Sequence, residues 1–209
     1  MRYETGITDN EIQDNHETCY AKLKLYKDMG LDFFEVRKSI LDKTGLLEGR
    51  ILDVGTGKGV MAVFLAREGY SFTSIDNNED MLRMAALNLA YEGLLDRAEL
   101  HVMDLNSMEF ADGSFDNIFM IEALHHVHDA DKALSEMDRV LSPAGTMVLA
   151  DFNKKGFGTV DKVHRKEGHT HMNSLSGIED ARKWLSGRGY AVEEAGAPCH
   201  WVLIAKKER

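Results

Sequence analysis

The stretch from residue 51 to residue 60, Ile-Leu-Asp-Val-Gly-Thr-Gly-Lys-Gly-Val, constrains the fold more than any other part of this chain. A short run that is apolar except for Asp53 comes first, glycines alternate at 55, 57 and 59, and an apolar helical pattern begins at Val60. Alternating glycines allow positive φ angles and a close approach to a ligand, because no Cβ stands in the way. The stretch therefore predicts a buried strand, a turn open to a ligand, and a helix.

The spacing of these glycines excludes two common glycine loops. The dinucleotide fingerprint requires Gly or Ala five positions after the first glycine, where this chain has Val60. The phosphate-binding loop requires Ser or Thr after Gly-Lys, whereas Lys58 is followed by Gly59. What remains distinctive is an acidic residue, Asp53, two positions before the first glycine.

The rest of the chain alternates between strand and helix patterns. We expect strands at 51–54, 71–75, 98–103, 116–121, a segment that follows a Pro-Gly turn and ends near 151, 190–194 and 200–206. Five of them alternate with helices, which requires parallel pairing with helices on both faces of the sheet. The last two are joined only by a short turn and must be antiparallel. The predicted fold class is α/β, a Rossmann-like, seven-stranded, mostly parallel sheet whose last strand is antiparallel.

Length and pattern predict one domain with additions. At 209 residues the chain is long enough for one sizeable core. Residues 9–43 have the pattern of two helices broken at Gly30, so we expect a helical extension over 1–45 and the main domain over 46–209. Residues 152–173 are polar and contain glycine and histidine, which predicts an exposed insertion in that domain.

The amino-acid composition limits the classes of partner that the protein is expected to bind. The formal net charge is -10 and no dense Lys/Arg stripe is present, so a small-molecule partner is favoured over nucleic acid. The N-terminus has no apolar signal region and no run approaches the ~18 apolar residues of a membrane span, so no membrane partner is expected. Two cysteines, Cys19 and Cys199, do not make a disulfide framework, which favours the cytoplasm. The oligomeric state is left open.

Acidic residues stand at or near the ends of five predicted strands: Asp53, Asp76, Asp104, Glu122 and Asp151. Ligands of an open parallel sheet bind beyond the carboxyl ends of its strands, so these side chains are expected to rim one crevice. A carboxylate such as Asp76 accepts both hydroxyls of a ribose, because it offers two oxygens and no donor. The alternative is that these residues cap the helices that follow them.

The segment from Asp53 to Gly59 resembles the first motif of the class I S-adenosylmethionine-dependent methyltransferases. Residues 104–116 and 118–151 resemble the branch of that family that includes quinone-biosynthesis enzymes and many small-molecule methyltransferases. The resemblance implies that S-adenosyl-L-methionine is the cofactor, with a carboxylate holding its ammonium, another its ribose and a third its adenine. The cofactor-binding residues that it implies are Asp53, Gly55, Thr56, Gly57, Gly59, Asp76, Asn77, Asp104, Leu105 and Glu122.

The resemblance predicts transfer of a methyl group to a small-molecule acceptor. A sulfonium is already an activated electrophile, so the transfer mainly needs an aligned nucleophile. If the acceptor is a hydroxyl or a carbon acid, His125, His126 or Glu122 is a candidate to take its proton. The alternative is that the two histidines shape the cofactor pocket. The extension over 1–45 is interpreted as a partial lid, or else as a helical pair packed on the sheet.

A second group of residues suggests a metal. His164, His169, His171, Cys199 and His200 are expected on one edge of the sheet, and thiolate and imidazole ligands favour zinc or a similar transition metal. The alternative is that the loop histidines are only solvated.

Two other functions stay open beside a metal-independent methyltransferase. One is a non-catalytic S-adenosylmethionine-binding sensor or subunit, and the other is a metal-assisted methyltransferase. Amino methylation of DNA bases or of protein glutamine is disfavoured, because residues 122–125 lack the Asn/Asp-Pro-Pro-Tyr/Phe motif that the family usually has there.

Overall fold

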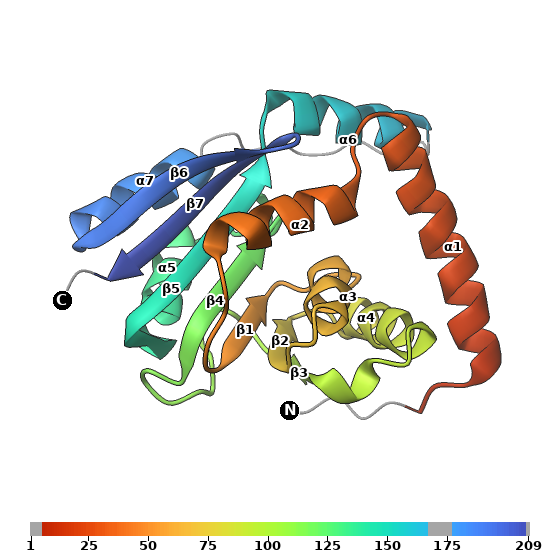
Figure 1. Cartoon of the computed structure of the whole chain (residues 1–209), viewed down its shortest axis with the longest axis horizontal. Coiled ribbons are helices and arrows are strands. Elements are labelled where there is room, and N and C mark those ends of the chain that lie inside the picture. The colour runs from red at the N-terminus through yellow and green to blue at the C-terminus, as the bar shows by residue number, and fades with distance from the viewer. Residues whose placement is uncertain (1–5, 167–176, 208–209) are drawn as a thin grey trace.

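The apolar run at Ile51–Val54 forms strand β1, in which all four residues are buried. It pairs in parallel with β2 (Phe72–Asp76) on one side and with β4 (Phe115–Ile121) on the other. In the computed structural model, which describes residues 6–166 and 177–207, this strand lies inside a seven-stranded sheet (Figure 1). The strand order is β3-β2-β1-β4-β5-β7-β6.

The remaining strands are β3 (Ala98–Val102), β5 (Leu141–Phe152), β6 (Tyr190–Ala197) and β7 (His200–Lys207). Strand β7 is antiparallel to both of its neighbours, β5 and β6, while the other pairings are parallel. This arrangement confirms the predicted fold class. Because β6 then runs in the same direction as β1 to β5, the turn between β6 and β7 lies at the carboxyl edge of the sheet.

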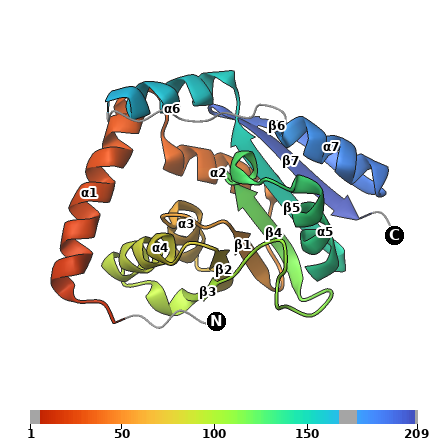
Figure 2. The same cartoon turned by 180° about the vertical axis from the view of Figure 1, so that it is seen from behind.

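Helices cover both faces of the sheet (Figures 1 and 2). The helices are α1 (Asp9–Asp28), α2 (Phe33–Thr44), α3 (Val60–Arg67), α4 (Glu79–Tyr91), α5 (Ala130–Val140), α6 (Lys154–Lys166) and α7 (Gly177–Gly187), with short turns η1 (Leu95–Arg97) and η2 (Leu124–His126). One apolar core receives side chains from α2, α3, α4 and α6, and the other from α5 and α7. Ile118 and Phe119, adjacent in β4, belong to different cores, as the alternation of side chains along a strand requires. No helix in the described ranges is long and apolar enough to cross a membrane.

The two N-terminal helices form where the sequence predicts them, because each has its own start signal. Thr8 and Glu11 form a reciprocal capping box at the start of α1. The Asp32 side chain accepts hydrogen bonds from two backbone amides of the first turn of α2. Gly30, with a φ of +88°, lies between the two helices.

The expectation that residues 152–173 are exposed is wrong for part of the described segment, while their status as an insertion stays a prediction. Residues 154–166 form α6, and Phe157, Val160 and Val163 on one face of that helix are buried in the core. These apolar residues are spaced three apart, a helical spacing that the surrounding glycine and lysine residues obscure. The structure also differs from the turn expected at Pro143. Pro143 lies within β5, at the place where the register of β5 against β4 shifts.

Helix α1 lies alongside α4 and reaches α6 at its other end (Figure 1). Glu11 of α1 forms an ion pair with Arg83 of α4. The Asn15 side-chain amide donates to the Asn88 side chain at 2.8 Å. The space between α1 and the carboxyl edge of the sheet is thereby bounded on two sides.

Gly59, at the start of α3, lies where α3 packs against α4. A Cβ at Gly59 would lie 2.7 Å from the Cβ of Ala85 in α4, whereas a Cβ at Gly69 would meet nothing within 4 Å. Both glycines have positive φ, so alanine at either costs about 1–2 kcal/mol of backbone strain. We expect Gly59→Ala to lower the free energy of unfolding by about 1–3 kcal/mol more than Gly69→Ala does, measured by urea denaturation. Equal losses would show that α4 moves away at no cost.

Candidate active site

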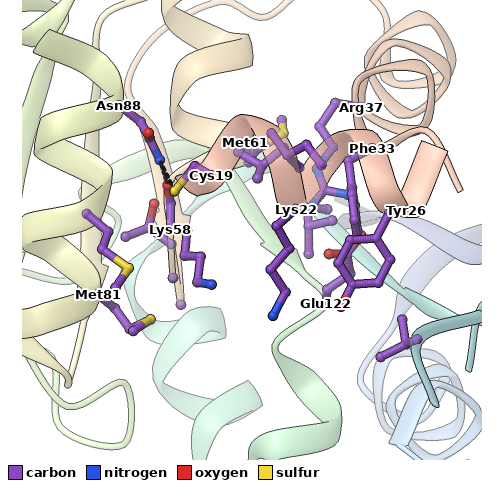
Figure 3. A pocket seen from close by; sticks show the side chains of 18 of the residues that line it. Cys19, Lys22, Tyr26, Phe33, Arg37, Lys58, Met61, Met81, Asn88 and Glu122 are labelled. Carbon is purple, nitrogen blue, oxygen red and sulfur yellow. Dashed lines mark hydrogen bonds and ion pairs between the residues drawn. The ribbon is translucent and has the colours of Figure 1, made fainter. Parts of the chain in front are cut away.

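A cavity of about 360 Å³ lies beyond the carboxyl ends of β1 and β4 and is bounded by α1, α2, α4 and α6 (Figure 3). Its volume is within the range of small-molecule sites. The sheet supplies residues that follow β1 and β4, while the helices supply both apolar and basic side chains. A crevice therefore exists at this edge of the sheet, and of the five carboxylates expected to rim it Asp53 and Glu122 line it, whereas Asp76, Asp104 and Asp151 do not.

The three glycines of the turn after β1 have different roles. All three have positive φ, +70° at Gly55, +53° at Gly57 and +78° at Gly59. Gly55 and Gly57 line the cavity, and a Cβ at Gly57 would meet no atom within 4 Å. A side chain at Gly57 would therefore occupy ligand space. Gly59 does not line the cavity, because it faces Ala85 of α4.

Two polar side chains of this turn are buried in the cavity wall. The Asp53 side chain is held by the Ser74 hydroxyl, which donates to it at 2.7 Å. Burial raises the pKa of the Asp53 carboxyl. The Thr56 hydroxyl is buried without a hydrogen-bond partner in the described part of the chain. A buried hydroxyl of this kind is expected to have a partner, so the wall fits a polar ligand.

The carboxylates at the end of β2 and after β3 accept hydrogen bonds from backbone amides. Asp76 accepts hydrogen bonds from the Gly57 amide at 2.8 Å and from the Asn78 amide at 2.9 Å. It therefore joins the glycine turn to the start of α4, and its role toward a ribose stays a prediction. Asp104 accepts from the Asn106 amide at 2.8 Å. Five predicted cofactor-binding residues lie outside the cavity wall: Gly59, Asp76, Asn77, Asp104 and Leu105.

Glu122, directly after β4, is the centre of a buried charge cluster. Its carboxylate accepts a hydrogen bond from Arg37 of α2, and His200 Nε2 lies 2.6 Å from the same oxygen. Burial raises the pKa of Glu122, but the positive charge of Arg37 and the contact with His200 outweigh burial and lower it to about 2. His200 Nδ1 lies 2.9 Å from the Pro198 carbonyl, so both ring nitrogens face acceptors.

His125 forms a pair with Asp151, at the end of β5. Nδ1 of His125 lies 2.7 Å from one carboxylate oxygen, and its backbone amide donates to the other at 3.0 Å. Both side chains are almost fully buried. A carboxylate at Nδ1 selects the tautomer in which Nε2 is the basic nitrogen. His126 also lines the cavity, and its ring lies 4.0 Å from that of His125 between centroids.

The predicted metal ligands are brought together only in part. His164 lines the cavity, whereas His200 is engaged by Glu122 and Pro198. Cys199 is buried, and its thiol donates to the Gly30 carbonyl at 3.6 Å. His169 and His171 lie outside the described residues. Within the described ranges no three His, Cys, Asp or Glu side chains are grouped as metal ligands.

The extension interpreted as a partial lid lines the cavity with one face of α1, on which Asn15, Thr18, Lys22 and Leu23 were not identified from the sequence. These residues recur at helical spacing along α1 and include both polar and apolar types, so an apolar pattern alone does not reveal them. The face consists of Asn15, Thr18, Cys19, Lys22, Leu23 and Tyr26. Arg37 and Asp151 were also missed as the partners of Glu122 and His125.

Comparison with known proteins agrees with this geometry. Residues 52–149 match a family described as methyltransferase domain. The chain is 37% identical over 150 residues to the methyltransferase GfsG of Streptomyces halstedii, covering 70% of this chain and 52% of that protein. It is 35% identical over 157 residues to a ubiquinone/menaquinone biosynthesis C-methyltransferase of Geotalea daltonii, covering 74% of this chain and 67% of that one. The chain thus spans about half the length of the first relative and two thirds of the second.

Solved structures share the fold. A putative S-adenosylmethionine-dependent methyltransferase of Methanococcus maripaludis superposes with a TM-score of 0.73 at 19% identity, covering 99% of this chain and 98% of that chain. An S-adenosylmethionine-dependent methyltransferase of Aquifex aeolicus superposes with a TM-score of 0.67 at 22% identity, covering 88% of this chain and 97% of that chain.

We expect the charge cluster around Glu122 to contribute less to the free energy of unfolding in acid. The pKa of Glu122 is lowered from 4.5 to about 2 by folding, so its contribution is present above pH 4.5 and is lost as the pH falls toward 2. A shift of this size corresponds to about 3 kcal/mol. We expect the difference in free energy of unfolding between wild type and Glu122→Gln to shrink over this pH interval. Exposed Glu109 provides the control, Glu109→Gln; a difference for Glu122→Gln that is independent of pH would contradict the prediction.

Proposed function

The chain belongs to the class I S-adenosylmethionine-dependent methyltransferase family, and we propose that it transfers a methyl group to a small-molecule acceptor bound in the cavity. The observation that carries the proposal is a cavity at the glycine turn with an open face at Gly57 and a buried, unpaired hydroxyl at Thr56. S-adenosylmethionine supplies a methyl group that its sulfonium already activates. The protein then has to bind, orient and desolvate the acceptor.

We assign the cofactor to the wall formed by the glycine turn. Gly55 and Gly57 give it a surface without side chains, and the Thr56 hydroxyl offers a hydrogen bond. Asp53 supplies a buried carboxylate beside this turn. Asp76 fixes the Gly57 amide, so it determines the shape of the turn as well as offering oxygens at the end of β2.

Among the residues predicted to take a proton, the geometry favours His125. Asp151 fixes its ring, which leaves Nε2 as the basic nitrogen, and the residue lines the cavity. Glu122 has a pKa of about 2, too low for efficient proton abstraction at neutral pH. We propose that His125 receives the proton that a hydroxyl or carbon acid loses as it gains the methyl group. An acceptor that is already ionised needs no base.

We propose that the described part of the N-terminal extension, residues 6–45, forms the lid of this site. Both α1 and α2 contribute cavity residues, and each contacts other elements of the fold. Helix α2 is fixed to the end of β4 through Arg37 and Glu122. The acceptor is a small molecule rather than a nucleic acid, and the two free thiols Cys19 and Cys199 suit the cytoplasm.

Cofactor binding is tested with Gly57→Ala. The added methyl group projects into the cavity, whereas Gly69→Ala introduces similar backbone strain in a different place. We expect Gly57→Ala to weaken S-adenosylhomocysteine binding at least about tenfold in calorimetric titration, and Gly69→Ala to leave it unchanged. If wild-type protein is folded and binds neither S-adenosylmethionine nor S-adenosylhomocysteine, the proposed function fails.

Catalysis is tested with His125→Gln. With a hydroxyl or carbon-acid acceptor found by screening, we expect kcat to fall by about 10²–10⁴ while S-adenosylhomocysteine binding persists. Asp151 acts through His125, so Asp151→Asn should lower kcat and also change the pH profile of kcat. His126→Gln removes a neighbouring cavity histidine and should have a smaller effect. Unchanged kcat in His125→Gln would assign the residue to the pocket wall.

A further inference from the structure

Helix α1 has little apolar attachment to the fold that it covers. Within this helix, every residue of which the structure describes, Tyr26 near the C-terminal end is the one buried side chain. Its contacts with α4 include the ion pair between Glu11 and Arg83 and a stack of the His16 ring on Tyr91, with 3.4 Å between centroids. Segments with few buried apolar side chains open at a low free energy. Individual polar contacts therefore have a large share in keeping α1 docked.

A further contact between α1 and α4, made by Asn88, also reaches the glycine turn. The side-chain nitrogen of Asn88 donates to the Lys58 carbonyl at 2.8 Å (Figure 3). The side-chain oxygen of Asn88 accepts from the Asn15 side chain of α1 at 2.8 Å. The Cys19 sulfur, one turn further along α1, lies 3.8 Å from the Asn88 nitrogen and 3.5 Å from the Asn15 oxygen. All four residues line the cavity, so Asn88 connects its two walls directly.

The Lys58 carbonyl fixes the direction of each hydrogen bond in this network. A carbonyl only accepts, so the Asn88 nitrogen faces it and the Asn88 oxygen faces α1. That oxygen needs a donor, so Asn15 turns its nitrogen toward Asn88 and its oxygen toward the Cys19 thiol. Asn88→Asp would set a carboxylate oxygen against the Lys58 carbonyl, and Asn15→Asp would set one against the Asn88 oxygen. In each variant two acceptors face each other.

The orientation of the Lys58 carbonyl depends on the conformation of the glycine turn. Lys58 lies between Gly57 and Gly59, whose φ angles are +53° and +78°. Glycines give the backbone on both sides of Lys58 a wide choice of conformations. Asp76 restrains one side by accepting from the Gly57 amide. A cofactor that lies on the turn restrains it further, and with it the carbonyl to which Asn88 donates.

We propose that Asn88 is a positioning residue that couples cofactor binding to closure of α1 over the acceptor site. The inference rests on the proposed methyltransferase function. With the cofactor on the glycine turn, the Lys58 carbonyl stays where Asn88 donates to it, and Asn88 holds Asn15 and the N-terminal half of α1. With the turn empty, the carbonyl changes orientation and α1 detaches more often. Cofactor binding thus shifts α1 toward its docked state, which completes the wall of the acceptor site.

Amide hydrogen exchange of α1 tests this coupling. Residues 9–14 lie outside the cavity wall, so a ligand in the cavity does not cover them directly. We expect saturating S-adenosylhomocysteine to slow their exchange about fivefold or more in wild type. Asn88→Asp and Asn15→Asp should each reduce this response to less than about twofold. Calorimetric titration should still detect ligand binding by both variants.

The second variant separates coupling from damage to the turn. Asn15→Asp leaves the hydrogen bond between Asn88 and Lys58 in place, and Asn15 is half-buried on α1, so this variant keeps the test valid if Asn88→Asp does not fold. Because coupling between two sites is reciprocal, Asn15→Asp should weaken S-adenosylhomocysteine binding by no more than the factor by which the ligand slows exchange in wild type.

Glu11→Gln is the matched control at the same interface. It removes the charge that pairs with Arg83, while glutamine keeps an acceptor for the capping box. The pair does not involve the glycine turn. We therefore expect α1 to exchange faster both with and without S-adenosylhomocysteine, and the ratio of the two rates to stay as in wild type. A purely structural contact at Asn88 would behave in the same way as Glu11.

Two results would overturn the inference. One is that S-adenosylhomocysteine binds wild type but leaves the exchange of α1 unchanged. The other is that the response survives in either aspartate variant, or that Glu11→Gln abolishes it as they do. In both results wild type still binds the ligand, so the proposed methyltransferase function stands. Absence of binding by folded wild type is a separate result, and it overturns the function and the coupling together.

Discussion

The buried contact between Arg37 and Glu122 joins parts of the chain that are far apart in sequence. Arg37 belongs to the second helix, Glu122 follows the fourth strand, and His200 begins the last strand. Removing one member of a buried ion pair typically costs about 3–5 kcal/mol, because the other charge is left without compensation. The helix over the cavity, the end of β4 and the reversed strand β7 therefore hold one another in place.

The carboxylates at the strand ends show how one edge of a sheet serves several purposes. Asp76 fixes the glycine turn, Glu122 anchors α2, and Asp151 orients His125. The same kind of residue at equivalent places in the strands thus shapes a loop, secures a helix and sets a tautomer. This edge of the sheet is organised by hydrogen bonds within the chain and is not a ring of free acids.

Much of the fold follows from the sequence because its signals are local. The glycine turn at 51–60, the break at Gly30 and the short link before His200 each depend on neighbouring residues, and each is found in the structure. The site was foreseen less completely. The pairing of His125 with Asp151 and of Glu122 with Arg37 depends on contacts between distant segments, which no local pattern encodes. Helix α6 was missed because glycine and lysine residues obscured its apolar face.

The face of α1 that borders the cavity is encoded separately from the glycine turn that borders it from the other side. The two walls are joined through Asn88 of α4, whose side chain accepts from Asn15 of α1 and donates to the Lys58 carbonyl of the turn. Substitutions along α1 can therefore reshape one half of the cavity while the backbone of the other half keeps its conformation. A scaffold divided in this way can diversify in what it accepts, by natural drift or by design, without rebuilding its core.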